Sequence, residues 1–303
     1  MHVFRFAATL VAAAWMSIAH AQAPATDASP LDAGVLRVER HGERGPPVIL
    51  IPGLASGAWV WRDSIAALRA GHRVYAVTLP GFDGRAAAPG DPLALAADAL
   101  HAFIVAQRLE RPVLVGHSLG GTLALMLAAA NPDLVGGVVT VDGLPVFPGT
   151  ENIDAGGRDA LAERFRERLA GLSPAQFEAQ QLQYMRGIGV IDEAKAAEVA
   201  RLTSGSDPRA VADYAAAVVA RDLRPQLPGI RVPVLAVVPC YAPDLAAMGL
   251  SQEAKVAYYR TLLSGVARLD VVAIAPARHF AMLDQPQAFT DALAKFLAAH
   301  AAR

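Results

Sequence analysis

A six-residue stretch, Gly116 to Gly121, constrains the fold of this chain more than any other feature. It reads Gly-His-Ser-Leu-Gly-Gly and follows Pro112–Val115, a short apolar run that is typical of a buried parallel strand. A run of strong helix formers, Thr122–Ala130, comes directly after it. Ser118 therefore lies where a strand turns sharply into a helix. The glycines on both sides leave room for the strained backbone that such a turn requires.

Strands and helices alternate through most of the chain, which predicts an α/β fold with a doubly wound, mostly parallel sheet. The predicted strands are Val35–Glu39, Val48–Ile51, Arg73–Leu79, Pro112–Val115, Leu134–Val141, Val232–Val238 and Leu269–Ile274. The predicted core helices are Trp59–Leu68, Pro92–Arg108, Thr122–Ala130, Ser251–Leu263 and Gln285–Ala298. In such a sheet ligands bind at the carboxyl ends of the strands.

One segment departs from this alternation. After the strand that ends at Asp142, residues 148–228 show helical patterns and no strand pattern. The four predicted helices are Gly157–Ala170, Pro174–Arg186, Asp192–Thr203 and Pro208–Leu223. We therefore divide the chain into a first core part (24–147), a helical insertion (148–228) and a second core part (229–303).

The N-terminus has the pattern of a cleavable secretory signal peptide, which we place at residues 1–23. Arg5 precedes the apolar stretch Phe6–Ile18, and two Ala-x-Ala sites predict cleavage near Ala21 or Ala23. This pattern predicts a periplasmic or secreted protein without a membrane span. Residues 24–32 are expected to be a poorly ordered linker. With Cys240 as the single cysteine, no intramolecular disulfide can form.

The charge balance excludes several classes of partner. The chain has 27 basic and 28 acidic side chains, a net charge of −1 and no block of like charge. Nucleic acid or an anionic membrane surface would require a basic patch, so a small neutral or apolar molecule is the expected partner. No Cys/His cluster has zinc spacing and no G-x-G-x-x-G follows the first strand, so we expect neither metal nor redox cofactor. The oligomeric state stays open.

A serine hydroxyl is a weak nucleophile and needs a base to remove its proton. His279 follows the last predicted strand, at the same edge of the sheet as Ser118. The other histidines outside the signal peptide lie before strands, within a helix, beside Ser118 or in the C-terminal tail. The side chain of His117 is expected to point away from the site. His279 is therefore the predicted base.

The Ser118 stretch resembles the G-x-S-x-G nucleophile elbow of the α/β-hydrolase superfamily, in the strand–turn–helix context that this motif requires. The resemblance implies an α/β-hydrolase fold in which the helical insertion is a cap, with Ser118 as nucleophile and His279 as base. It also implies that the backbone N–H groups of Leu54 and Leu119 form the oxyanion hole. Pro52 stands where the superfamily usually has histidine, but the Leu54 donor is a main-chain group and is unaffected.

The acid behind the histidine has two candidates. The usual superfamily position follows the strand Val232–Val238, where this chain has Asp244, later than usual and without the customary glycine. Some members, notably in the haloalkane-dehalogenase branch, carry the acid where this chain has Asp142, and the residues around His279 resemble that branch. We favour Asp142 and keep Asp244 as the alternative.

Together these features predict an exported serine hydrolase that cleaves a carboxylic ester of a small or medium uncharged substrate through an acyl-enzyme intermediate. A thioester, lactone or amide remains open as the bond cleaved. An acyltransferase or a carbon–carbon bond hydrolase would use the same triad, and a ligand-binding protein could retain the scaffold. Haloalkane dehalogenation is disfavoured because Ser118 replaces the carboxylate nucleophile which that reaction needs.

Overall fold

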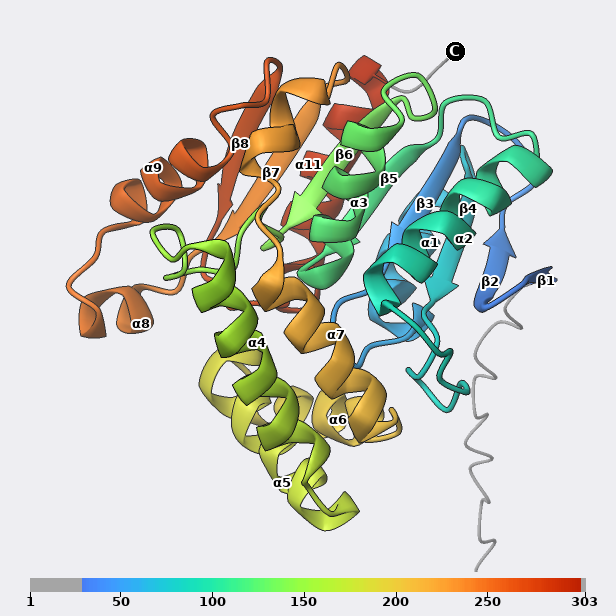
Figure 1. The fold of residues 1–303 in the computed structure, drawn as a ribbon. Coiled ribbons are helices and arrows are strands. Elements are labelled where there is room, and N and C mark those ends of the chain that lie inside the picture. Colours follow the sequence, from blue (N-terminus) through green and yellow to red (C-terminus); the bar gives the residue numbers. More distant parts are fainter. Residues whose placement is uncertain (1–28, 301–303) are drawn as a thin grey trace, which may run out of the picture.

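The protein contains an eight-stranded sheet with helices packed on both faces (Figure 1). A computed structural model describes residues 29–300. The strand order is β1-β2-β4-β3-β5-β6-β7-β8. The strands are β1 (Ser29–Ala33), β2 (Leu36–His41), β3 (Pro47–Ile51), β4 (Arg73–Thr78), β5 (Val113–His117), β6 (Gly137–Val141), β7 (Val234–Pro239) and β8 (Leu269–Ile274). β2 pairs antiparallel with β1 and β4, and all other pairs are parallel. The predicted doubly wound, mostly parallel sheet is confirmed.

The helices of the sheet layers agree with the predicted ones to within a few residues. They are α1 (Arg62–Leu68), α2 (Pro92–Ala106), α3 (Leu119–Ala130), α8 (Ala242–Ala247), α9 (Gln252–Leu262), α10 (Ala281–Asp284) and α11 (Pro286–His300). Two 3₁₀ turns, η1 (Ala58–Trp61) and η3 (Arg224–Gly229), add to them. Because η1 is a 3₁₀ turn, the α-helix predicted from Trp59 begins only at Arg62. α8 and α10 are not among the predicted helices, because helices of six and four residues are too short to show a helical pattern in the sequence.

The first strand of the sheet corrects a prediction. Residues 24–32 were expected to be a poorly ordered linker, yet β1 pairs with β2, with Ser29 opposite Arg40 and Ala33 opposite Leu36. The chain turns back between the two strands at Gly34, where φ is 65°. An edge strand pairs through backbone N–H and C=O groups, so a sequence of low β-propensity can still join a sheet. Residues 24–28 and the predicted signal peptide lie outside the described residues.

β3 shows how the sheet is covered on both sides. Every residue of β3 is buried, and alternate side chains enter separate apolar clusters. Ile49 and Ile51 pack in the cluster that contains residues of α2 and α3. Val48 and Leu50 pack in the cluster that contains residues of α1 and α11. A strand buried on both faces explains the continuous apolar run from which it was predicted.

Four helices lie between β6 and β7, where the helical insertion was predicted. They are α4 (Ala155–Ala170), α5 (Pro174–Tyr184), α6 (Glu193–Thr203) and α7 (Pro208–Ala220). A side chain that accepts hydrogen bonds from first-turn N–H groups caps the start of each helix, and the caps are Asp154, Ser173, Asp192 and Asp207. α5 ends earlier than predicted because the chain continues as a π turn, η2 (Met185–Gly189). Figure 1 shows these helices together at one end of the sheet.

No helix within residues 29–300 is long and apolar enough to cross a membrane.

Candidate active site

Ser118 lies between β5 and α3, at the sharp turn that the sequence predicts. Its φ of 51° and ψ of −120° are a strained conformation for any residue other than glycine. Backbone hydrogen bonds hold it there: its N–H donates to the Val141 carbonyl at 2.9 Å, and its carbonyl accepts from the N–H groups of Gly121 and Thr122 at 2.8 and 3.1 Å. Because that carbonyl already accepts helical bonds, α3 begins at Leu119, before the predicted start at Thr122.

The glycines on both sides of Ser118 lie too close to other backbone for any side chain. A Cβ on Gly116 would lie 2.1 Å from the carbonyl oxygen of Gly120. A Cβ on Gly120 would in turn lie 2.3 Å from the carbonyl oxygen of Ile51. Backbone oxygens cannot rotate away as a flexible side chain can, so the turn requires glycine at both positions.

The loop after β3 packs against this turn. A Cβ on Gly53 would lie 3.2 Å from the Cβ of Ser118. The predicted oxyanion donors therefore belong to two segments that adjoin Ser118, since Leu54 follows Gly53 and Leu119 is the first residue of α3. The first N–H groups of a helix have no acceptor within the helix and attract negative charge.

The structure brings His279 and Asp142 together. Asp142 follows β6 directly, and its Oδ2 lies 2.5 Å from Nδ1 of His279. A carboxylate only accepts hydrogen bonds, so Nδ1 donates and Nε2 of the neutral ring is left able to accept a proton. The two side chains are 15% and 14% exposed, respectively. Burial alone would raise the pKa of the Asp142 carboxyl, but the hydrogen bond and charge of His279, with contributions from Lys255 and Tyr259, lower it to about 2.

The alternative acid, Asp244, is engaged elsewhere. It lies in the first turn of α8, and both its oxygens pair with the Arg278 guanidinium, at 2.8 Å to Nε and 2.9 Å to Nη2. This pairing raises the pKa of Arg278. Of the two predicted candidates, Asp142 is therefore the one that contacts His279.

Comparison with known proteins agrees with this geometry. The sequence profile of the Alpha/beta hydrolase family matches residues 48–292, which include every site residue described above. The chain belongs to this family. It is 30% identical over 230 residues to RutD of Azorhizobium caulinodans, a protein named as a carbamate hydrolase, covering 71% of this chain and 83% of that protein.

Two further proteins show how far this alpha/beta hydrolase resembles others. A pimeloyl-[acyl-carrier protein] methyl ester esterase of Vibrio atlanticus is 30% identical over 200 residues, covering 63% of this chain and 74% of the esterase. The crystal structure of a hydrolase from Pseudomonas aeruginosa superimposes with a TM-score of 0.73 at 21% identity, covering 90% of this chain and 99% of that one. At that identity the superposition shows a shared fold.

His117 corrects a prediction, because its side chain was expected to point away from the site of this alpha/beta hydrolase and instead packs against His279. Its ring centroid lies 4.5 Å from that of His279, and its Nε2 is 3.1 Å from the His279 carbonyl oxygen. Since a carbonyl only accepts, Nε2 of His117 carries the proton and donates. Burial, followed by the neighbouring His279, holds the pKa of His117 well below its usual value, so the ring is neutral.

The helical insertion also contacts the loop that carries His279. The backbone N–H of His279 donates to the carbonyl of Ile188 at 3.1 Å, and that of Phe280 donates to Gly189 at 3.0 Å. Both acceptors belong to η2. The Tyr184 ring stands edge-on to the His279 ring, with 6.1 Å between centroids. Nothing in the sequence marked these contacts, because they depend on a π turn that periodicity does not reveal.

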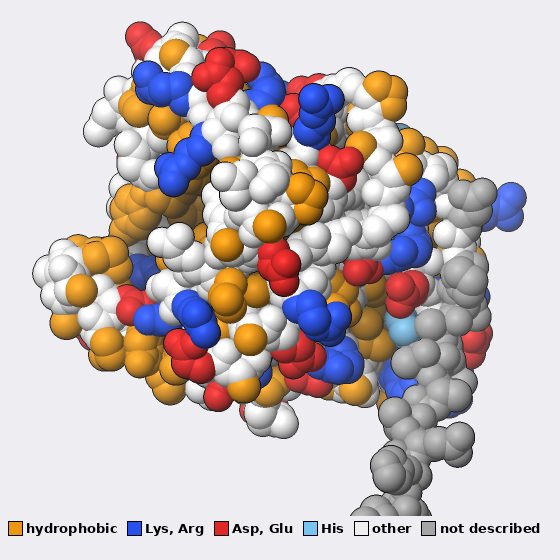
Figure 2. All heavy atoms as spheres, turned by 90° about the horizontal axis from the view of Figure 1, so that it is seen from below, with side chains coloured by type: hydrophobic (Ala, Val, Ile, Leu, Met, Phe, Trp, Pro, Cys, Tyr) orange, Lys and Arg blue, Asp and Glu red, His pale blue; other side chains and the backbone are white. Residues whose placement is uncertain are grey.

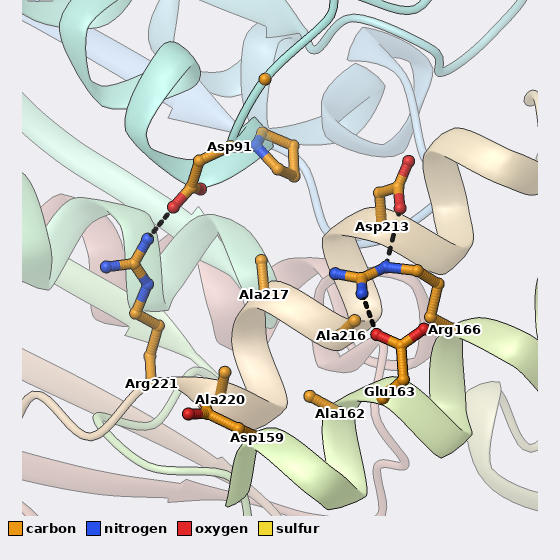
Figure 3. Close-up of a pocket in the computed structure, with 12 residues that line it drawn as sticks. Asp91, Asp159, Ala162, Glu163, Arg166, Asp213, Ala216, Ala217, Ala220 and Arg221 are labelled. Atoms are coloured by element: carbon orange, nitrogen blue, oxygen red, sulfur yellow. Dashed lines mark hydrogen bonds and ion pairs between the residues drawn. The ribbon is translucent and has the colours of Figure 1, made fainter. Parts of the chain in front are cut away.

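Two cavities stand out in the described part of the chain, and neither contains the predicted catalytic side chains. The larger, about 700 Å³, lies between the start of α2 and the helices α4 and α7. In it Arg166 is paired with Glu163 and Asp213, and Arg221 with Asp91 (Figure 3). The smaller, about 450 Å³, is lined by Cys240, by apolar residues of α8 and its surroundings, and by the polar residues Ser251 and Gln252 at the start of α9. Within residues 29–300, no group of three or more His, Cys, Asp or Glu could hold a metal ion.

Proposed function

We propose that this chain is a serine hydrolase that cleaves an uncharged carboxylic ester. The observation that carries the proposal is the 2.5 Å hydrogen bond between His279 and Asp142. The His279 ring packs against His117, the residue directly before the strained Ser118 turn. Asp142 fixes the ring with Nδ1 protonated, and an Nε2 free of its proton is what a serine nucleophile needs from its base.

The proposed reaction transfers an acyl group in two steps. Nε2 of His279 takes the Ser118 hydroxyl proton while Oγ attacks the ester carbonyl, and the oxyanion is bound by the N–H groups of Leu54 and Leu119. One such donor is worth about 3 kcal/mol in the transition state. The tetrahedral intermediate then expels the alcohol, which receives the proton from His279. Water repeats the attack on the acyl-enzyme and releases the carboxylic acid.

Three observations support an uncharged substrate. On the face shown in Figure 2, which looks onto the end of the molecule where the insertion lies, acidic and basic side chains are interspersed. Several of the arginines of the insertion are paired with acids, as Arg166 is with Asp213 and Arg186 with Glu193. The relatives are named for a methyl ester and for a carbamate, and both compounds present a neutral carbonyl to a nucleophile. We therefore include carbamates beside esters as a second candidate class.

Fluorophosphonate labelling and a substrate panel test this proposal. We expect wild-type protein to hydrolyse p-nitrophenyl acetate and butyrate and to be labelled at Ser118. Ser118→Ala should lose both properties. Ser264→Ala, which alters an exposed serine far along the chain, should keep both. Labelling without turnover on esters, thioesters, lactones and carbamates would contradict the hydrolase and leave a binding or transferase role. Absence of both would refute a serine enzyme of any kind.

We further propose that the protein is exported. The support is the sequence pattern of residues 1–23, with its apolar stretch and Ala-x-Ala sites. Expression of the full chain in a Gram-negative host, followed by fractionation and intact-mass analysis, tests it. We expect periplasmic protein that begins at residue 22 or 24, and uncleaved cytoplasmic protein would contradict export.

A further inference from the structure

α9 brings a buried tyrosine to the far side of Asp142. Tyr259 is 4% exposed and packs in an apolar cluster with residues of the β6–α4 connection, of β7 and of α8. Its hydroxyl donates a hydrogen bond to Oδ1 of Asp142. The other oxygen, Oδ2, accepts from Nδ1 of His279. Each oxygen of the carboxylate therefore has its own side-chain donor, supplied by a different element of the fold.

Such a second donor has a physical purpose. A buried carboxylate can accept more hydrogen bonds than one imidazole N–H can donate. Each acceptor position without a donor lowers the free energy of unfolding. The Asp142 N–H cannot help its own side chain, because it donates to the Val237 carbonyl at 3.0 Å. Burial also raises the pKa of Tyr259 well above its usual value, so the phenol keeps its proton and remains a donor.

The same face of α9 adds a positive charge. Lys255 lies one helical turn before Tyr259, its Nζ 6.0 Å from the centre of the tyrosine ring. That ammonium group donates to the Pro239 carbonyl at 2.7 Å, which fixes it beside the end of β7. The charge lowers the pKa of Asp142. α9 therefore supports the carboxylate by hydrogen bonding and by electrostatics together.

We propose that Tyr259 is a positioning residue for catalysis: its hydroxyl fixes the rotation of the Asp142 carboxylate and takes up part of its negative charge, so that His279 is held in line with Ser118. This inference rests on the proposed serine hydrolase function. In this proposal α9 contributes no atom to the reaction, but its Tyr259 side chain helps to orient the base His279 through Asp142.

A neighbouring tyrosine provides a matched control. Tyr258 precedes Tyr259 on α9, and its hydroxyl donates to Oε1 of Glu151, outside the Ser118–His279–Asp142 group. Tyr259→Phe and Tyr258→Phe each delete one hydroxyl from one helix, and both keep the ring. When both variants are assayed well below their melting temperatures, a difference in catalysis between them comes from the lost contact with Asp142.

The test is the dependence of kcat/KM on pH for the wild type and both variants. We expect Tyr259→Phe to lower kcat by about 10-fold with KM nearly unchanged, the size expected for one hydrogen bond to a charged group. Without this donor, the carboxylate keeps more of its negative charge and stabilises the protonated His279 ring more strongly. The acidic limb of the profile therefore moves to higher pH. Tyr258→Phe should follow the wild-type profile. An acidic limb that is unchanged or moved to lower pH in Tyr259→Phe would overturn the proposal.

Several other ionisable groups lie near Asp142 and Tyr259. They are His117 on β5, Tyr184 on α5, Cys240 after β7, and Lys255 and Tyr258 on α9. His117 is held neutral, and burial raises the pKa of Tyr184 and of Cys240. None of these three groups is therefore expected to change its charge in the acidic limb of an esterase profile.

A second readout does not depend on turnover. The proton between Nδ1 of His279 and Oδ2 of Asp142 should give a resolved low-field proton NMR resonance. We expect Tyr259→Phe to move or broaden this resonance and Tyr258→Phe to leave it unchanged. If the resonance responds in this way while no substrate is hydrolysed, the proposed function fails and the role of Tyr259 in positioning the pair stands. An identical resonance in all three proteins would refute that role.

Discussion

The exchange Asp142→Asn has the most specific expected outcome. The asparagine side chain would retain an oxygen to accept from the Tyr259 hydroxyl at the position of Oδ1. Its NH₂ group would then replace Oδ2, which now accepts from Nδ1 of His279 at 2.5 Å. An NH₂ group donates, so Nδ1 would have to accept, and the ring proton would move to Nε2. A ring protonated at Nε2 cannot take the proton of Ser118.

We therefore expect Asp142→Asn to lower kcat by about 10³–10⁴-fold, the size known for loss of the correct tautomer in serine triads. This corresponds to about 4–5 kcal/mol of transition-state stabilisation. KM should change little, because Asp142 contacts His279 and Tyr259 rather than substrate. Steady-state hydrolysis of p-nitrophenyl butyrate measures both constants, and unfolding in urea checks that the variant is folded.

Asp244→Asn is the matched control, because it makes the same exchange at the other candidate acid. It weakens a partly exposed pair with Arg278, with 35% and 16% of the two side chains accessible. Such pairs contribute up to about 1 kcal/mol to the free energy of unfolding. We expect kcat within about 3-fold of the wild type. A kcat of Asp142→Asn within about 10-fold of the wild type would refute the assignment of the acid, because loss of the correct tautomer should cost far more. A loss of activity in Asp244→Asn as large as that in Asp142→Asn would refute it as well.

Three further variants test other parts of the structure. Gly116→Ala places a Cβ 2.1 Å from the Gly120 carbonyl oxygen, so urea titrations should show the free energy of unfolding lowered by about 1–3 kcal/mol. The control Gly71→Ala has no atom near its added Cβ and should change that free energy by less than about 0.5 kcal/mol. His117 is neutral in the folded protein, but in the unfolded chain it binds a proton below its pKa of about 6.5, so the stability that it contributes above this pH is lost as the pH falls. Between about pH 7.5 and 5, the urea midpoint of His117→Gln should therefore fall less steeply than that of the wild type. Arg278→Gln removes hydrogen bonds to the carbonyls of Arg186 and Val190, and hydrogen exchange measured by mass spectrometry should show faster amide exchange in η2. If η2 exchanges at the same rate in Arg278→Gln as in the exposed control Arg62→Gln, the Arg278 guanidinium does not stabilise the insertion.

Much of the fold could be predicted because apolar runs and helix caps are local signals. β3 is buried on both faces, so its sequence is continuously apolar, and Asp207 caps a helix whose first residue is a proline. β1 was missed because an edge strand is held by backbone pairing with β2, which leaves no apolar pattern to detect. The change from α5 into the π turn η2 was missed for a similar reason, since hydrogen-bond register does not alter composition.

The site shows the same division between local and long-range information. The strained turn at Ser118 could be predicted because its strand, glycines and helix are consecutive in the chain. The choice between Asp142 and Asp244 could not be settled, because each follows a strand that ends at the same edge of the sheet. Only the three-dimensional structure shows that Arg278 occupies both oxygens of Asp244. Tyr259 is 117 residues from Asp142, and an ordinary helix pattern gives no sign of that contact.

The central claim is that Ser118 carries the acyl group during turnover. The most direct test mixes the protein with p-nitrophenyl acetate, quenches the reaction with acid during steady-state turnover and maps acetylated peptides by mass spectrometry. We predict one acetyl group on the peptide that contains Ser118, no acetyl group in Ser118→Ala, and the same acetylation in Ser264→Ala as in the wild type. Steady turnover in Ser118→Ala, or an acetyl group found only on another residue, would contradict the claim.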